Sequence, residues 1–519
     1  MFNLPLISTL KLGPAPKPIV GNDVPNSEIW AVLGKWAKKY GDVLHFRIFS
    51  RHFVVLSSLE SALDLYEKRS KTYAGRPTSA MSDLVRNGSV LFSQPGNRLE
   101  IYRRLLRAWL NPDIAKKHFH IQREETNNFL KKVVGSKDTM SIMARRYAGS
   151  IAIRLAYGDI PEKKKEEFAQ IADELLVVQN QGGQPSRWLV NSFPILRFVP
   201  AWFPGAYFKR WASETHMKTN ELIKTPIQMI RQQMSTGEAV PSFATHFLEN
   251  TEGLIPHRSD RDDIVACAAN SFYAAGTETT SGFVALCFLL LSLHPEIQRK
   301  GQAEIDAVVG TEALPSIEHR TELPYIESVL KEVHRFHPAA PLLFHATTED
   351  DNYKGYFIPK GCTVYANIWL MLRDPAHYAE PELFKPERFM VESPPPDPRK
   401  LTFGLGRRQV NCPGQHVGDV SLWLTLARTI ATCNIKSCTM VDGKPIDKLN
   451  IPFMQGLASS VSFRTFCPQF THTFFQVRLN LSTATLNIGL EHTGRCWIID
   501  DTHNHKFTCC RPVCTVSLE

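Results

Sequence analysis

The chain has 519 residues, of which 43% are hydrophobic and 21% charged, and it carries 11 cysteines. This composition is ordinary for a folded globular protein, so it excludes intrinsic disorder, collagen-like repeats and a coiled coil. The formal net charge of +9 permits contact with an anionic membrane surface or an acidic protein, but no dense basic block indicates nucleic acid. The absence of any C-x-x-C pair favours a reducing compartment with buried thiols over a zinc ribbon.

The N-terminus predicts neither a signal peptide nor a membrane anchor. It lacks a charged segment followed by a long apolar core, and it reaches the proline-rich stretch 13–18 almost at once. The longest apolar run, residues 283–293, has about half the length that spans a bilayer. We therefore expect that this chain does not cross a membrane.

The hydrophobic pattern predicts short strands first and then a mostly helical chain. Strand signals occur at residues 43–48 and 53–56, and again at 363–366 after a Pro-Lys-Gly turn. The helices that we expect run from Ser259 or Asp260 to Leu293, from Pro295 onward, from Pro324 to about Arg335, and from Gln415 to Thr432. The first of these is apolar on all sides in its second half, so it should pass through the centre of the protein.

An aromatic and apolar segment at residues 188–208, broken by prolines, has two readings of about equal weight. It contains Trp188, Phe193, Phe198, Trp202 and Phe203. One reading is a loop buried in the core. The other is an exposed apolar surface that contacts a membrane or admits apolar substrates.

The long central helix contains the sequence Ala-Gly-Thr-Glu-Thr-Thr at residues 275–280. Small residues there would let a flat ligand approach the backbone, while Glu278 and Thr279 are polar residues that an apolar helix disfavours. The simpler explanation is that the Thr279 hydroxyl bonds to a carbonyl one turn earlier. The functional explanation is a proton relay to a reacting oxygen species.

A second motif places Glu332 and Arg335 three residues apart on one helix, and a third, Pro-Glu-Arg-Phe at 386–389, supplies Arg388. Such a helical pair often means only a surface ion pair of little energetic weight. If the three side chains are buried together, they form a charged network instead. The sequence leaves both interpretations open.

A fourth motif is a glycine-rich loop that begins at Phe403 and leads to Cys412-Pro413-Gly414 and a helix. A cysteine just before a helix N-terminus meets the positive end of the helix dipole, which favours the thiolate. A thiolate is a soft metal ligand. A lone cysteine is more often a small buried hydrophobe, but this setting favours ligation.

Together and in this order, the four motifs resemble those of the cytochrome P-450 family of haem-thiolate monooxygenases. The resemblance covers about residues 14 to 466. Its details at 39–41, 202–205 and 412–416 are most similar to fungal members that act in secondary metabolism. It implies a mainly α fold with small β-sheets (α+β), with haem held between the long central helix and the helix after the cysteine loop.

The resemblance also implies roles for individual residues. Cys412 would be the axial ligand of the haem iron, and Thr279 and Glu278 would deliver protons to the reacting oxygen. Glu332, Arg335 and Arg388 would form the structural triad that holds the cysteine loop. The remaining cofactor-binding residues would be Arg103, His345, Arg408 and Phe403, and the apolar substrate pocket would be lined by Ala274, Ala275 and residues 339–344.

The implied reaction inserts one atom of dioxygen into an apolar small molecule, a secondary-metabolite intermediate, and releases the other as water. The cofactor would be heme b (iron protoporphyrin IX), and NADPH would supply electrons through a separate reductase that docks near Arg399, Lys400 and Arg407. The resemblance places the protein on the endoplasmic reticulum membrane surface by peripheral contact. Without that contact, we expect it in the cytoplasm.

Two departures from the family pattern leave an alternative open. Gln409, Val410 and Asn411 separate Arg408 from Cys412, whereas the family pattern has one residue there. Leu99 also stands where a tryptophan usually donates to a haem propionate. Because of the two-residue insertion before Cys412, the alternative is a catalytically impaired haem-binding remnant. A peroxide-rearranging isomerase on the same fold is a second rival, against which the Glu278 and Thr279 pair argues.

We predict a catalytic domain over residues 1–466 and an atypical cysteine-rich tail over 467–519. The tail holds five of the 11 cysteines, and the family normally ends near residue 460. Adjacent cysteines without a partner pair argue against a zinc site in it. Intron read-through or a shifted reading frame would explain both the tail and the longer cysteine loop, which transcript sequencing can test.

Overall fold

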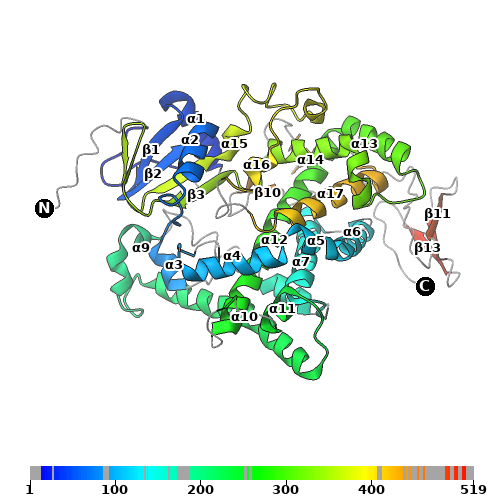
Figure 1. Cartoon of the computed structure of the whole chain (residues 1–519), viewed down its shortest axis with the longest axis horizontal. Helices are drawn as coiled ribbons and strands as arrows, with labels where there is room; N and C mark the ends of the chain where they lie inside the picture. Colours follow the sequence, from blue (N-terminus) through cyan, green and yellow to red (C-terminus); the bar gives the residue numbers. More distant parts are fainter. Residues whose placement is uncertain are drawn as a thin grey trace.

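The computed structural model describes residues 13–25, 28–85, 90, 93–133, 136, 138–161, 164–171, 188–249, 254–255, 260–405, 412–435, 440–441, 444–445, 453–454, 460–461, 486–490, 496–500 and 505–509. Within these ranges the chain is mainly helical with small sheets, which confirms the predicted fold class (Figure 1).

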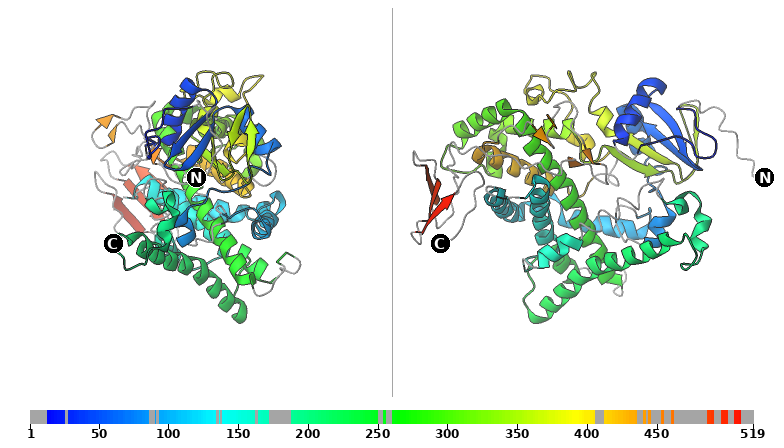
Figure 2. Two further views of the ribbon diagram at one scale, coloured as in Figure 1. Left: turned by 90° about the vertical axis from the view of Figure 1, so that its left-hand side faces the viewer. Right: turned by 180° about the vertical axis from the view of Figure 1, so that it is seen from behind.

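The helices gather into one large body, with a smaller sheet at the end nearest the N-terminus (Figures 1 and 2). The longer ones are α1 (Ile29–Tyr40), α4 (Asn97–Trp109), α6 (Phe119–Val133), α7 (Met140–Tyr157), α10 (Tyr207–Thr236), α12 (Arg261–Leu293), α13 (Pro295–Val308), α14 (Pro324–Phe336) and α17 (Gln415–Thr432). The shorter ones are α2 (Leu59–Leu63), α3 (Ala80–Val85), α5 (Pro112–Lys117), α9 (Leu189–Ser192), α11 (Phe243–Glu249), α15 (Ile368–Met371) and α16 (Arg399–Thr402), with single turns at η1 (Asp64–Lys68), η3 (Pro194–Phe198), η5 (Ile317–Glu322) and η6 (Pro386–Phe389).

The main sheet joins strands that are far apart in the sequence. Its order is β1 (Val43–Ile48), β2 (Arg51–Leu56), β6 (Thr363–Asn367) and β3 (Leu342–Ala346). Within this sheet only β2 and β6 run parallel, and Val54 of β2 lies opposite Val364 of β6. On the other side of β6, the antiparallel strand β3 places His345 opposite the same Val364. Smaller sheets pair β4 (Asp351–Tyr353) with β5 (Tyr356–Ile358), β7 (Met440–Val441) with β8 (Lys444–Pro445), β9 (Phe453–Met454) with β10 (Ser460–Val461), and β11 (Leu486–Leu490) with β12 (Cys496–Asp500) and β13 (His505–Cys509).

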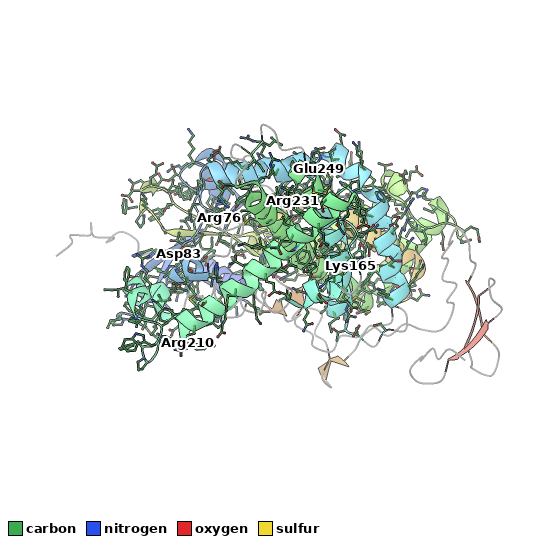
Figure 3. The ribbon with its side chains drawn as sticks, turned by 90° about the horizontal axis from the view of Figure 1, so that it is seen from below. Arg76, Asp83, Lys165, Arg210, Arg231 and Glu249 are labelled. Atoms are coloured by element: carbon green, nitrogen blue, oxygen red, sulfur yellow. The ribbon has the colours of Figure 1, made fainter. Side chains whose placement is uncertain are left out.

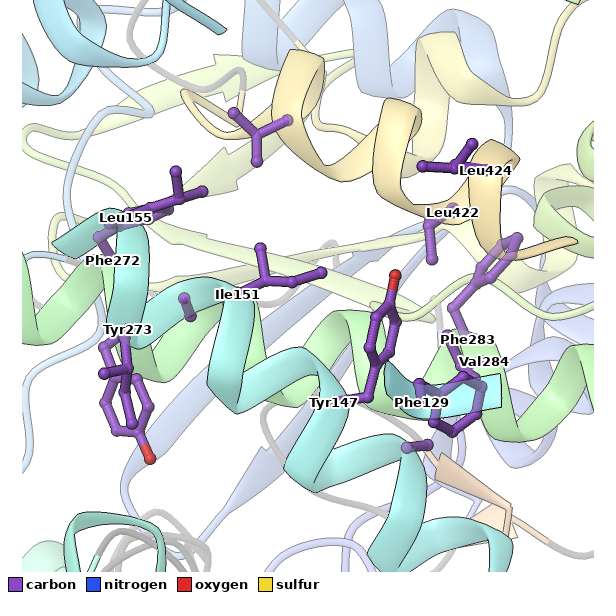
Figure 4. Packing of buried hydrophobic residues seen from close by; sticks show 14 of the residues in the cluster. Phe129, Tyr147, Ile151, Leu155, Phe272, Tyr273, Phe283, Val284, Leu422 and Leu424 are labelled. Atoms are coloured by element: carbon purple, nitrogen blue, oxygen red, sulfur yellow. The ribbon is translucent and has the colours of Figure 1, made fainter. Parts of the chain in front are cut away.

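Helix α12 passes through the middle of the helical body, as its apolar second half predicts. Every residue from Ser281 to Leu293 is buried. It packs along α7 and also meets α10, α11 and α17. Figure 4 shows side chains of α7, α12 and α17 meeting in this core, where the Tyr147 hydroxyl lies 2.6 Å from that of Thr425. The site described below therefore includes one wall made by this central helix.

The length and composition of α12 would also allow it to cross a membrane, and it is the one such helix among the described residues. Its neighbours bury 67% of the apolar window that meets this test. The helix therefore acts in this structure as the core around which the others pack.

The predicted helix boundaries agree closely with the structure for α14, which begins at Pro324, and for α17, which follows Gly414. At α12, Ser259 lies outside the described residues, and Asp260 occupies the N-cap without a side-chain cap bond. Asp262 and Asp263 do lie in its first turn. They form ion pairs with Arg231 of α10 and Arg98 of α4, which fasten both helices to the start of α12.

The aromatic segment at 188–208 divides between the two predicted readings. Trp188 is 8% exposed and packs on Trp211 of α10, with 4.8 Å between ring centroids. By contrast, Trp202 is 79% exposed and Phe198 71%. The first residues of the segment are thus anchored in a small core, while η3 and the turn after it present an exposed apolar surface.

Candidate active site

A single large cavity of about 730 Å³ brings together most of the predicted site residues. Its walls come from α4, α7, α12, α14, β3 and the start of α17. Cys412 and Phe403 lie on this wall, and so do Arg103, His345, Glu278 and Thr279. Arg408 lies outside the described residues.

Cys412 stands two residues before the N-cap of α17, and its thiol is exposed to the cavity. Its backbone N–H donates to the carbonyl of Phe403 at 2.8 Å. This bond joins the two ends of the cysteine loop, so Cys412 reaches the cavity wall despite the longer spacing from Arg408. A Cβ added at Gly414 would lie 3.8 Å from the Cys412 sulfur, so the glycine leaves that side of the sulfur open.

The surroundings of Cys412 have opposite effects on the pKa of its thiol. Burial of the group within the protein raises the pKa of the Cys412 thiol, while the backbone amide of Gly414 and the positive charge of Arg103 lower it. The amide at the helix start therefore acts in the expected direction on the Cys412 pKa, but burial outweighs it in the protein without a cofactor. A metal ion at this sulfur would favour the thiolate, because a coordinated thiol loses its proton.

Arginine side chains form the positive part of the cavity wall. Burial, followed by the charges of Arg107 and Arg76, lowers the pKa of Arg103 to about 10, so Arg103 stays charged at neutral pH. Arg76 also lines the cavity and donates to the Phe344 carbonyl at 2.8 Å. Sequence reasoning missed Arg76, since only the fold places residues 75 and 346 side by side. Figure 3 labels Arg76 within the body of the molecule.

His345 is buried beside these arginines. Its Nε2 lies 3.5 Å from a guanidinium nitrogen of Arg76. Burial is the main reason, and the two arginines the next, why the pKa of His345 falls to about 3. The imidazole of His345 is therefore neutral at physiological pH, and it can act there as a hydrogen-bond donor but not as a cation.

The polar pair on α12, Glu278 and Thr279, faces the cavity and is not enclosed by the apolar packing of this helix. Thr279 is exposed on the cavity wall and Glu278 is half-buried there. The Thr279 hydroxyl donates to the Ala275 carbonyl at 2.9 Å, which is the simpler of the two predicted explanations. Its lone pairs remain for a partner in the cavity.

The small residues of α12 have two separate uses. Ala274 and Ala275 are exposed on the cavity wall. A Cβ on Gly276 would meet Ala152 of α7 at 3.6 Å, and one on Gly149 would meet Thr277 at 3.6 Å. These two glycines therefore lie where α7 and α12 approach each other. Residues 339–344, except Pro341, line the cavity as expected.

Glu332, Arg335 and Arg388 form one buried network, so the surface-pair interpretation is wrong. Glu332 and Arg335 have no exposed side-chain surface, and Arg388 is 6% exposed at its side chain. Arg335 donates twice to Glu332, each bond 2.8 Å long, and Arg388 donates at 3.0 Å. The two guanidinium groups also bind backbone carbonyls of residues 372 and 379–383.

Arg399 does not offer a free charge to a partner, contrary to expectation. Its guanidinium lies 2.6 Å from Asp397, 2.8 Å from Glu327 and 3.0 Å from Asp419. These carboxylates neutralise it and tie α16 to α14 and α17. Lys400 is exposed, and Arg407 lies outside the described residues.

A cysteine at a helix start, on a cavity wall that also carries arginine side chains, has the donor chemistry that suits a thiolate-bound metal cofactor. A model of the cytochrome P450 family matches residues 12–459, so the chain belongs to this family. Its members are monooxygenases that take a haem cofactor, redox partners and small-molecule substrates.

Curated fungal relatives support the same assignment over most of the chain. Cytochrome P450 monooxygenase claR of Ampulloclitocybe clavipes is 35% identical over 87% of this chain and 84% of its own length. Cytochrome P450 monooxygenase 208 of Postia placenta is 35% identical, with coverages of 86% and 87%. Cytochrome P450 monooxygenase ppsD of Aspergillus oryzae is 34% identical, with 85% of each chain covered.

The residues present fit a haem. The cavity of about 730 Å³ has room for a flat macrocycle. A soft sulfur ligand faces it, and Arg76, Arg103 and neutral His345 supply donors for two carboxylates. The missing tryptophan at Leu99 removes one donor, and Arg76 supplies a donor elsewhere on the same cavity wall.

Glu332→Gln tests the buried network. The amide keeps the shape but removes the negative charge that two buried arginines share, so the free energy of unfolding should fall by about 3–5 kcal/mol. Urea unfolding followed by circular dichroism measures this. Glu322→Gln, at an exposed site before α14, should change stability by less than about 0.5 kcal/mol. Equal stability of the two variants would contradict the network's role.

Proposed function

We propose that this chain is an active haem-thiolate monooxygenase of secondary metabolism, with its catalytic domain over residues 1–466 and with heme b as cofactor. The observation that carries this proposal is the hydrogen bond from Cys412 to the Phe403 carbonyl, at 2.8 Å, which keeps the thiol on the cavity wall. The longer cysteine loop therefore gives no reason to favour an impaired remnant.

In this proposal, Cys412 holds the haem iron, Phe403 covers the sulfur side, and Arg76, Arg103 and His345 bind the propionates together with Arg408. When bound, the haem supplies the activation of dioxygen, with thiolate donation favouring cleavage of the O–O bond. The chain supplies position, protons and exclusion of water. Glu332, Arg335 and Arg388 hold the segment that leads to the cysteine loop.

The proton relay falls to Thr279 and Glu278. In the structure the Thr279 hydroxyl donates a hydrogen bond to the Ala275 carbonyl, so its oxygen can accept one from the cavity side. To donate into the cavity, it must rotate away from Ala275 while a carboxyl group or water restores the proton. Glu278 lies on the same wall and is the nearest acid in sequence to do so.

The substrate that this cavity favours is an apolar small molecule. The walls of the same cavity include Ala274 and Ala275 of α12 together with Ala339, Ala340 and Phe344. Such walls bind by burial and leave the position of oxidation to shape. Electrons would come from NADPH through a separate reductase, whose acidic surface would meet exposed basic residues such as Lys400 and not Arg399.

Membrane contact is the proposed role of the exposed apolar surface formed by residues 193–207. Ile195 is 75% exposed, and Arg197 and Arg210 stand beside the aromatic residues. Figure 3 labels Arg210 at the edge of the molecule. An apolar surface flanked by cations suits an anionic bilayer, and the endoplasmic reticulum surface is where the reductase partner would be met.

Cys412→Ser tests the axial ligand. A serine hydroxyl is a poor thiolate substitute, so the thiolate-type Soret band of the reduced carbon monoxide complex should disappear. Difference spectra of purified protein measure it. Cys362→Ser, at the buried residue just before β6 whose thiol bonds the backbone carbonyl of His52, should leave the band in place. An unchanged band in Cys412→Ser would overturn the assignment.

Thr279→Val tests the relay. Product formation should fall by about 100-fold, the lower end of what a positioned proton donor contributes. NADPH consumption should continue, with its electrons recovered as hydrogen peroxide. The assay uses the reductase-reconstituted enzyme and a substrate found by product analysis of an expressing host. Thr277→Val, on the same helix but buried with its hydroxyl on Tyr273, is the matched control. Equal coupling in both variants would remove Thr279 from the relay.

Ile195→Ser with Trp202→Ser tests the membrane surface. Each exposed side chain inserted into a bilayer gains about 1.5–3 kcal/mol, so the double variant should bind vesicles at least tenfold more weakly. Flotation with vesicles of equal parts phosphatidylcholine and phosphatidylserine measures this. Leu383→Ser with Val391→Ser removes two apolar residues that are exposed elsewhere, at 46% and 54%, and should not weaken binding. If both double variants lost vesicle binding to the same extent, the surface at residues 193–207 would have no special role in membrane contact.

A further inference from the structure

His334 of α14 is a buried histidine that neither the Glu332 network nor the proposed relay uses. It lies between Glu332 and Arg335 in sequence but lines the cavity, with 4% of its surface exposed. A histidine inside an apolar wall costs free energy unless its nitrogen atoms are satisfied. Its surroundings therefore call for an explanation.

The imidazole is fixed on three sides. Its ring centroid is 4.5 Å from that of Phe283 on α12 and 5.4 Å from that of Phe403. Its Nδ1 lies 3.3 Å from the hydroxyl oxygen of Thr402. Its Nε2 is buried and has no hydrogen-bond partner within the described part of the chain.

His334 is neutral at physiological pH. Burial lowers its pKa to about 4, and the nearby charges partly cancel, since Asp419 and Asp397 raise the pKa while Arg399 and Arg320 lower it. When the Thr402 hydroxyl donates to Nδ1, the ring proton sits on Nε2. An unpartnered buried N–H costs about 1–3 kcal/mol, so it indicates a ligand that the protein is built to receive.

The residues that His334 contacts are connected to Cys412 through one backbone hydrogen bond. Thr402 and Phe403 are consecutive residues, and the Phe403 carbonyl accepts the Cys412 backbone N–H at 2.8 Å. The imidazole is therefore one of the surfaces that decide where Phe403 lies, and through Phe403 where Cys412 lies. Phe403, His334 and Cys412 all line the same cavity.

We propose that His334 is a positioning residue for the cysteine ligand, which holds Thr402 and Phe403 through Nδ1 and its ring and offers Nε2–H to the cofactor side of the wall. This inference rests on the proposed haem-thiolate function. A donor near the ligand stabilises negative charge there, and groups around a metal ligand tune the reduction potential in this way.

The test compares His334→Leu with His334→Gln. Leucine keeps apolar volume but removes the polar nitrogen atoms, whereas glutamine restores an amide N–H near the position of Nε2. We expect a tenfold shift of the one-electron reduction equilibrium against the reduced state in the leucine variant, which is about 59 mV more negative. The glutamine variant should stay within about threefold of the wild type.

The readouts are the reduction potential of the substrate-free holoenzyme and the thermal unfolding of the apoprotein. His337→Gln is the control, because His337 is equally buried three residues further along but does not line the cavity. It should lower stability and leave the potential unchanged.

Equal shifts for leucine and glutamine, or none for either, would overturn the proposal and reduce His334 to a packing residue. If His334→Leu does not fold, His334→Met takes its place, with the same expected shift. The wild-type carbon monoxide spectrum separates this result from the proposed function. A missing thiolate-type band in the wild type refutes the function itself, whereas a normal wild-type band with unshifted variants refutes only the role of His334.

Discussion

The buried charge of Glu332 is the constraint on which the rest of the site depends. One carboxylate without exposed surface accepts hydrogen bonds from two guanidinium groups and from the backbone N–H of Lys385. Removing any partner leaves a charge that water cannot reach, so the whole set forms together or not at all. Because Arg335 and Arg388 also bind carbonyls of residues 372 to 383, the network gives an irregular stretch of chain one conformation.

The same helix, α14, carries the next layer of the site. Glu327 and Asp397 hold Arg399, and Asp419 of α17 holds both Arg399 and Arg320. These ion pairs fix α16 against α14 and α17, which places Thr402 and Phe403 at the cavity. The cysteine therefore derives its position from ion pairs on one side and from a backbone hydrogen bond on the other. Local sequence around Cys412 alone would not hold it there.

Much of the helical framework could be predicted from the sequence, because helix starts and the burial of an apolar helix depend on neighbouring residues in the chain. Pro324 and Gly414 mark helix starts, and the apolar run of α12 demands burial, so those elements follow from short-range physics. Arg76 could not be found, because it reaches the cavity through a bridge between residues 75 and 346. The neutralisation of Arg399 was equally hidden, since two of its three carboxylate partners come from α14 and α17.

The fold accommodates the two extra residues of the cysteine loop, although comparison with the family pattern suggests that they would displace Cys412. Eight residues, 404 to 411, separate Phe403 from Cys412, where the family pattern has six. For a loop whose ends are already joined, as the 2.8 Å bond joins these, the extra closure entropy of two residues is about 0.3 kcal/mol. A cost of that size is far smaller than the penalty for disrupting the Glu332 network. The position of the cysteine is therefore governed by the anchors at the two ends of its loop, and the number of residues between them matters little to where the sulfur lies.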